Sequence, residues 1–273
     1  MNVETYTVGK TSIQRSKDFD GDERGLIWLW EPPKPNANYV MGIDPSVGRT
    51  GWCRATRTAD DYRTDNGAIE VIRCGRPEEP DVQVAEYAAP VDAEDIGVVA
   101  AALGRLFAGC DENGALAIIE MYPGPGLLTY RKMVSDFGYT NHFVWKYLDT
   151  ISPTPNRFGF WPGRDANKYL WIRASRHIHG GGFIPHSPWL VEEMRNCEVD
   201  PTKMWGRAVY GTHDDRVRAM MMALWAAHDW TMQVDTAPPK VLVDAREPSW
   251  QASDISVDTM YERWEEKFAE MSE

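Results

Sequence analysis

The stretch that decides the fold is Tyr39-Val40-Met41-Gly42-Ile43-Asp44, a short apolar run that ends in an acid. A second run of the same kind occupies residues 115–119 and ends in Glu120. Apolar runs of this length are typical of strands that are buried on both faces of a parallel sheet. Open α/β sheets bind their ligands at the carboxyl ends of such strands. We therefore expect Asp44 and Glu120 to share one edge of the sheet.

A third group of acids opens the last strongly apolar segment of the chain. The residues Thr212-His213-Asp214-Asp215 precede a helical pattern that extends to residue 232. One interpretation is a simple capping box, in which Thr212 caps the helix and Asp215 stands three positions later. The other interpretation makes both acids ligands, although helical spacing separates them by roughly a third of a turn. Asp214 and Asp215 therefore both remain candidates.

These acids suit a divalent metal. Mg²⁺ and Mn²⁺ prefer hard oxygen ligands, and converging carboxylates repel one another when no cation is present. Two cations about 3.5–4 Å apart support in-line attack on a phosphodiester bond. We therefore expect a metal site with Asp44, Glu120, Asp214 and Asp215 as its catalytic ligands.

The order of the remaining patterns predicts an α/β fold with a mixed sheet of five or more strands and helices on both faces. The pattern reads as three strands, a helix, a strand, a helix and a fifth strand. The expected strands are 39–44, 51–58, 68–73, 115–119 and 142–147, with an edge strand at 26–30, and the first two helices are 92–108 and 127–137. Further helices are expected at 166–179, 187–197 and 213–232, with a hairpin within 199–210.

Length and composition favour one large domain with appendages. The 273 residues are 43% hydrophobic and include 12 Trp, enough for a substantial core. We expect a lead-in over 1–37, a central domain over 38–234 and an acidic tail over 235–273 with a surface helix at 257–271. No run of 18 apolar residues and no signal-peptide core occur. The four cysteines are scattered, as expected for reduced thiols in a protein that is not secreted.

Four longer segments resemble the C-terminal nuclease domain of the large terminase subunit of tailed bacteriophages, a ribonuclease H-like nuclease. They are WEPPKPNANYVMGIDPSVG (30–48), AIIEMYPGPGLL (117–128), FIPHSPWLVEEM (183–194) and GTHDDRVRAMMMALWAAHD (211–229), and the resemblance covers 24–232. It implies a ribonuclease H-like fold and an endonuclease that cuts double-stranded viral DNA during genome packaging. It also implies two Mg²⁺ or Mn²⁺ ions on Asp44, Glu120 and the Asp214/Asp215 pair, with Asp215 the direct ligand and His213 behind it.

The resemblance further implies partners and a location. Double-stranded DNA, an ATPase motor domain, a portal and a small terminase subunit are the expected partners, in the cytoplasm of an infected bacterial host. The chain departs from a complete large terminase because it shows no ATPase motif. Gly9-Lys10-Thr11 ends like a Walker A sequence, but Glu4 stands where that motif needs glycine. We therefore expect no nucleotide site in this chain.

The charge distribution is unusual for a DNA-binding protein. The net charge is −12, and half of it lies in residues 235–273, which hold ten acidic and four basic residues. Nonspecific DNA affinity normally comes from Lys and Arg on phosphates. A basic stripe over 157–176 suits that role, or is simply a solvated helix face. The candidates for DNA contact are Lys168, Arg173 and Arg176, with Arg131 and Lys132 in support.

Two alternatives remain open at the level of sequence. The chain is also compatible with a ribonuclease H-like nuclease of the resolvase or transposase type. The second alternative is a non-catalytic docking module for a packaging motor or portal, in which the acids are structural. Zinc on His177, His179 and His186 is not expected, because no fourth ligand has usable spacing and histidines suit a helix end.

Overall fold

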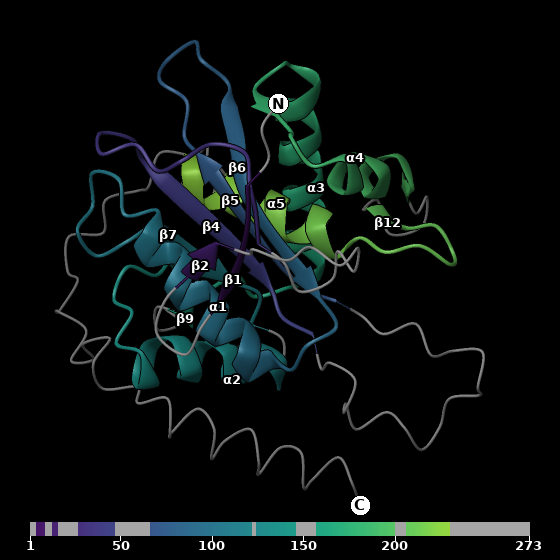
Figure 1. The fold of residues 1–273 in the computed structure, drawn as a ribbon. Helices are drawn as coiled ribbons and strands as arrows, with labels where there is room; N and C mark the ends of the chain where they lie inside the picture. Colours follow the sequence, from purple (N-terminus) through teal and green to yellow (C-terminus); the bar gives the residue numbers. More distant parts are fainter. Residues whose placement is uncertain are drawn as a thin grey trace, which may run out of the picture.

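The computed structural model describes residues 4–8, 13–15, 27–46, 66–121, 124–145, 157–199 and 206–229. Its main feature is an eight-stranded mixed sheet with helices on both faces (Figure 1). The strand order is β2-β1-β3-β6-β5-β4-β7, and β10 pairs with β6. The peripheral strands are β1 (Glu4–Val8), β2 (Ile13–Arg15), β3 (Ile27–Leu29) and β10 (Phe183–Ile184). The α/β class predicted from the sequence is confirmed.

Four central strands position the acids. Strands β4 (Tyr39–Asp44), β5 (Gly67–Arg73) and β6 (Asp81–Ala89) form an antiparallel meander. Strand β7 (Leu116–Ile119) then pairs parallel to β4, on the side away from β5. Helix α1 (Ala93–Leu106) makes the crossover that a parallel pair requires. The central sheet is therefore mixed, as the sequence predicted.

The third strand of the meander is β6, which the sequence patterns did not predict. Polar residues interrupt its apolar pattern, yet Gln83 and Glu86 are buried together with their polar partners. The predicted strand 51–58 lies outside the described residues.

The fifth predicted strand, 142–147, is only partly regular. Within the described residues of that range, β8 (Val144–Trp145) pairs with β9 (Arg157–Phe158), whereas only isolated bridges connect His142 and Phe160 to the β7 side of the sheet.

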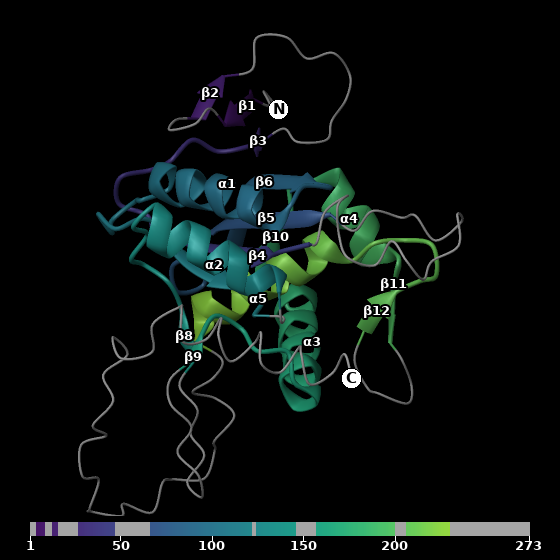
Figure 2. The same cartoon turned by 90° about the horizontal axis from the view of Figure 1, so that it is seen from below.

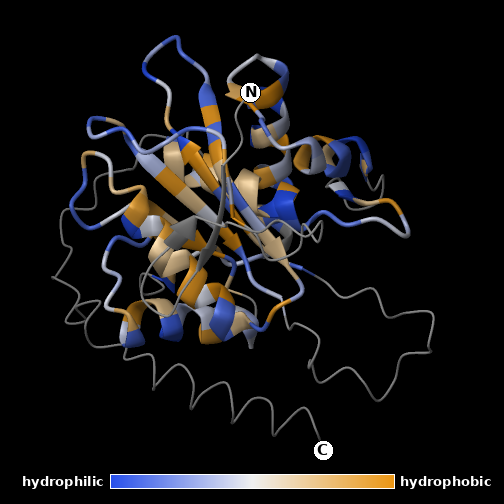
Figure 3. Ribbon diagram, in the orientation of Figure 1, coloured by the Kyte–Doolittle hydropathy of each residue, from blue (hydrophilic) through white to orange (hydrophobic). Residues whose placement is uncertain are grey.

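Two hydrophobic layers enclose the sheet. Helices α1, α2 (Pro125–Tyr130) and η3 (Arg131–Asp136) cover one face. Helix α5 (Asp215–His228) covers the other, supported by α3 (Arg164–His179) and α4 (Pro188–Arg195). Figure 2 shows α3 extending away from the sheet, and Figure 3 shows the hydrophobic residues concentrated in the central strands and the helices against them.

The five helices predicted between residues 92 and 232 are confirmed within the described residues, but one predicted cap is wrong. Ser187 caps α4, because its hydroxyl accepts a hydrogen bond from the Leu190 amide at 3.1 Å. Thr212 does not cap α5: its hydroxyl bonds the Val209 carbonyl, and Asp214 occupies the N-cap position. The Thr212 hydroxyl therefore stabilises the turn before α5, and Asp214 and Asp215 occupy the start of the helix.

The remaining predictions for the second half of the chain have a simple outcome. Strands β11 (Cys197–Val199) and β12 (Gly206–Ala208) form the expected hairpin. The surface helix predicted at 257–271 lies outside the described residues. Within the described part of the chain, no helix has the length and apolar character needed to cross a membrane.

Helix α5 lies directly on the backbone of the central strand. A Cβ atom added at Gly42 would stand 1.8 Å from the Ala219 carbonyl oxygen and 2.8 Å from the Ala223 amide nitrogen. Only glycine permits this approach, because these obstacles are backbone atoms of a packed helix. Gly42 therefore sets how closely the middle of α5 approaches β4.

We expect Gly42→Ala to destabilise the protein by about 1–3 kcal/mol or more, the scale of an overpacked core. Gly163→Ala is the matched control, because no atom lies within 4 Å of the added Cβ and its φ of −98° suits any residue. Chemical denaturation of both variants measures the difference. Equal stability of the two would contradict the close contact.

A second constraint is a group of buried polar side chains between the sheet and α5. Glu70 and Glu86 stand opposite each other on β5 and β6, and both are fully buried. Arg216 on α5 pairs with Glu86 at 2.9 Å and with Glu193 at 2.6 Å. Glu70 accepts one hydrogen bond from Gln83 at 2.6 Å, while its second oxygen has no partner. Burial, reinforced by the charge of Glu86, raises the pKa of Glu70 well above its usual value.

The raised pKa of Glu70 predicts a pH-dependent stability. A group whose pKa is higher in the folded state favours folding below its unfolded pKa, and this contribution is lost as pH rises through the folded value. Glu70→Gln keeps the shape and cannot ionise. We expect the variant to exceed the wild type in stability by about 1–3 kcal/mol at alkaline pH, the scale of an unsatisfied buried polar group. The advantage should shrink on acidification.

Thermal unfolding across the pH range tests this expectation. Glu112→Gln, at an exposed position, serves as the control and should not change the pH profile. A Glu70→Gln effect that is independent of pH would contradict a raised pKa.

Candidate functional site

Asp44 and Glu120 lie side by side at the carboxyl edge of the sheet. Strands β4 and β7 are in register at Ile43 and Ile119, and the Glu120 amide donates to the Ile43 carbonyl at 2.9 Å. Ile43 and Ile119 face the α1 layer, so alternation turns the next residue of each strand toward α5. Asp44 is half-buried there, and Glu120 is buried.

The N-terminal end of α5 brings two further acids to the same edge. Asp214 is the N-cap residue and Asp215 is the first residue of the helix. Asp215 is buried, and its Oδ2 accepts a hydrogen bond from the Asn66 amide at 3.1 Å. His213 Nδ1 lies 3.5 Å from the same oxygen. The backbone at Asp214 is not helical, with φ of −132° and ψ of 17°, so the two acids are not bound to the angular separation that helical spacing would impose.

Arg218 supplies positive charge to this cluster. It stands one turn into α5, and its guanidinium donates to both carboxylate oxygens of Glu120. Two of its nitrogens also lie 3.4 Å from Asn167 Oδ1 on α3. Its side chain is only 17% exposed, so the pair is shielded from solvent. Arg218 therefore locks Glu120 between α5 and α3.

One arginine does not neutralise the acids. Burial raises the pKa of Asp44 well above its usual value, and the charge of Glu120 adds to this effect although Arg218 opposes it. Burial likewise raises the pKa of Asp214, against the opposing charge of Arg218. The cluster thus lacks positive charge at neutral pH. Carboxyl groups that are short of countercharge are the kind of oxygen donor that divalent cations prefer.

The structure therefore brings together the five residues that the sequence selected: Asp44, Glu120, Asp214, Asp215 and His213. Sequence reasoning missed Arg218 and Asn66. A signal for Arg218 was present, because it follows Asp214 by four positions and Asp215 by three, the spacing of neighbours on a helix. Asn66 offered no such signal, since it reaches Asp215 only through the fold.

The basic residues proposed for DNA contact occupy two separate places. Lys168, Arg173 and Arg176 lie on α3, in the layer of α5. Arg131 and Lys132 lie on η3, which packs against α1 on the opposite face. Lys132 also pairs with Asp136 at 2.9 Å. The α3 group is closer to the acids, because Asn167 beside Lys168 contacts Arg218.

The histidines of the rejected zinc interpretation do not meet one another. His179 is exposed and bonds the Ser175 carbonyl, and the backbone amide of His186 bonds Gln83. His177 instead meets Asp81 and His228, which the sequence did not single out.

No protein-family model and no curated protein sequence matches this chain. Among solved structures, the fold is similar to the human cytomegalovirus terminase nuclease domain. The Mn-soaked, inhibitor-bound form shows 10% identity and a TM-score of 0.47, over 72% of this chain and 86% of that chain. The Mn-soaked form shows 10% identity and a TM-score of 0.44, over 70% and 83%.

We expect Arg218→Gln to destabilise the metal-free protein by about 3–5 kcal/mol, because it leaves buried carboxylates without their partner. Added Mn²⁺ should recover part of the loss, since a ligand that binds only the folded state stabilises it. Thermal unfolding in EDTA and in Mn²⁺ measures both effects.

The matched control is Arg207→Gln, which removes an ion pair with Glu198 whose side chains are both more than half exposed. Such a surface pair contributes only about 0–1 kcal/mol. If Arg218→Gln were as stable in EDTA as Arg207→Gln, Arg218 would not be the counterion of the acids.

Proposed function

We propose that this chain is a metal-dependent endonuclease that cuts double-stranded viral DNA during genome packaging, by a two-metal-ion mechanism. The observation that carries the proposal is the convergence of Asp44, Glu120, Asp214 and Asp215 at the sheet edge, where Arg218 pairs with Glu120. Buried acids at such density destabilise a fold, so a functional reason for them is required. Phosphodiester hydrolysis by divalent cations supplies that reason.

Each side chain has a specific role in this proposal. Asp44, Glu120 and Asp215 would hold Mg²⁺ or Mn²⁺, with Asp214 as a further oxygen donor. When bound, the cations supply the charge that activates water and stabilises the leaving oxygen. The backbone amide of Asn66 and the imidazole of His213 orient Asp215. Arg218 orients Glu120 and balances part of the negative charge while no cation is present.

The proposed substrate contacts follow from charge. Lys168, Arg173 and Arg176 on α3 would bind backbone phosphates, which carry no sequence information. Cleavage should therefore show little sequence specificity. The net charge of −12 opposes tight binding of free DNA. We infer that an ATPase motor delivers the duplex, with a portal and a small terminase subunit as further partners.

The test is plasmid nicking and linearisation with Mn²⁺, Mg²⁺ or EDTA, compared between the wild type and Asp44→Asn. We expect metal-dependent cleavage by the wild type and a loss of roughly 10²-fold or more in the variant, the scale seen when one charge-stabilising group is removed from an active site. Asp95→Asn is the matched acid-to-amide control, on the exposed first turn of α1.

Cation binding is followed separately by thermal unfolding. Mn²⁺ should raise the melting temperature of the wild type and of Asp95→Asn, but much less that of Asp44→Asn. A folded protein that neither cuts DNA nor gains stability with either cation would refute the proposal and favour a docking module.

A further inference from the structure

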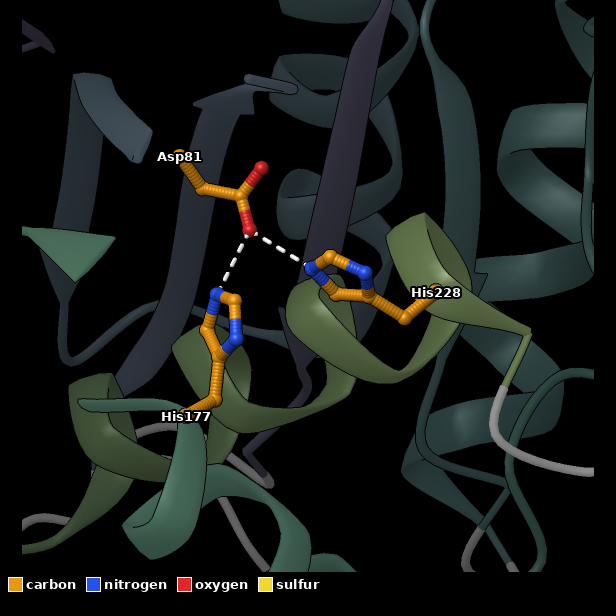
Figure 4. A group of neighbouring side chains, drawn as sticks. All are labelled: Asp81, His177 and His228. Atoms are coloured by element: carbon orange, nitrogen blue, oxygen red, sulfur yellow. Dashed lines mark hydrogen bonds and ion pairs between the residues drawn. The ribbon is translucent and has the colours of Figure 1, made fainter. Parts of the chain in front are cut away.

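A second cluster of metal-binding side chains lies away from the acids. Asp81 Oδ2 is 2.9 Å from His177 Nε2 and 2.7 Å from His228 Nε2. One ligand atom from each of the three side chains lies within 4.8 Å of the others. Figure 4 shows the two imidazole rings and the carboxylate pointing at one spot from three different elements. Asp81 begins β6, His177 lies in the last turn of α3, and His228 ends α5.

The carboxylate of Asp81 is held in position by the backbone. The Gly75 amide donates to Asp81 Oδ1 at 2.8 Å, which leaves Oδ2 directed at the histidines. A Cβ at Gly75 would stand 2.2 Å from the Glu79 carbonyl oxygen, so the turn that carries this amide requires glycine. Hydrogen bonds of this kind orient the first ligands of metal sites.

The two histidine rings are also closely packed. A Cβ at Gly182 would lie 2.4–2.8 Å from the His177 ring, so glycine makes room for that ring. The rings of His177 and His228 have centroids 4.5 Å apart and are tilted by 57°. Asp81 is 3% exposed, whereas His177 and His228 retain 23% and 34%. The cluster is therefore buried on the carboxylate side and open to solvent on the histidine side.

This cluster is distinct from the acidic site. Asp215 and His228 are the first and last residues of the 14-residue helix α5, which at 1.5 Å per residue separates them by about 20 Å. The chemistry also differs, because imidazole nitrogens suit transition metals whereas Mg²⁺ prefers oxygen.

We propose that Asp81, His177 and His228 bind one transition-metal ion, with Zn²⁺ the best fit. Two imidazoles and one carboxylate leave a fourth position open to water, on the solvent side of the cluster. Zinc–ligand distances of about 2.0–2.2 Å place tetrahedral ligand atoms about 3.4 Å apart, so the ligands must separate by roughly half an ångström. Rotations of the half-exposed imidazoles supply that movement.

An ion here would fasten three elements at the end of the domain opposite the acids. It would link the C-terminal turns of α3 and α5 to the start of β6. The segment after α3 already pairs with β6 through its backbone, because the Asp81 amide donates to the Gly182 carbonyl and Phe183 pairs with Asp81. Helix α5 would then be held at its last residue by the metal and near its first turn by Glu120. The ion would accordingly stabilise the placement of α5 without taking part in chemistry at the acids.

The experiment uses the full chain after dialysis against EDTA. Isothermal titration calorimetry with Zn²⁺ is run in excess Mg²⁺, which occupies oxygen sites, and Co²⁺ absorption reports the coordination geometry. We expect one equivalent of Zn²⁺ and the visible bands of four- or five-coordinate Co²⁺. His228→Gln and His177→Gln should each weaken binding by about tenfold or more. His179→Gln, two positions from His177 and exposed, is the control and should bind as the wild type does.

The glutamine variants separate a metal site from a hydrogen-bonded clamp. Glutamine can still donate to Asp81 but ligates zinc poorly. In EDTA we expect His228→Gln to melt close to the wild type. Zn²⁺ should raise the melting temperature of the wild type and of His179→Gln, but not that of His228→Gln or His177→Gln. If either variant fails to fold, the other provides the comparison.

The proposal would be overturned if the folded wild type did not bind Zn²⁺. It would also be overturned if His177→Gln and His228→Gln both bound Zn²⁺ as tightly as the wild type. Asp44→Asn should retain the Zn²⁺ equivalent, so failure of the nuclease proposal and failure of this one are distinguishable.

Discussion

The close contact between Gly42 and helix α5 is the constraint on which the rest of the structure depends. Because no side chain separates strand from helix, the start of α5 is held beside the carboxyl ends of β4 and β7. Asp215 and Arg218 thereby reach the neighbourhood of Asp44 and Glu120. The same rigid helix carries His228 at its other end to Asp81. One tight backbone contact thus positions two separate groups of polar side chains.

The face of the sheet beneath α5 carries an unusual density of buried acid. Four acidic side chains point toward this helix: Asp44, Glu120, Glu70 and Glu86. The helix supplies two basic side chains on the same side, Arg216 and Arg218. The two arginines do different things. Arg216 pairs with Glu86 on β6 and with Glu193 on α4, and these pairs hold α4 and α5 to the sheet. Arg218 pairs with Glu120 at the strand ends, where the acids still lack charge.

This difference separates buried acids with a structural role from buried acids with a functional role. A buried acid with its own arginine can be explained by packing and pairing alone. Acids that raise one another's pKa lower the stability of the fold, and such groups are characteristic of sites that bind a cation or a substrate. The strand-end cluster belongs to the second kind, and Glu70, whose partner is a neutral glutamine, lies between the two.

By itself the sequence determined the α/β class, most helices and the convergence of the acids. The apolar runs that end at Asp44 and Glu120 predict two strands and place both acids at the same edge of the sheet. Parallel register and the alternation of side chains along a strand then direct both acids to the same face. It could not reveal β6, whose buried Gln83 and Glu86 interrupt the apolar pattern and are tolerated only because distant partners satisfy them. Nor could it join Asp81, His177 and His228, because Asp81 precedes the two histidines by 96 and 147 residues along the chain. Local patterns report which face of an element is apolar, whereas only the tertiary structure decides which polar groups meet, because those contacts depend on how the elements pack.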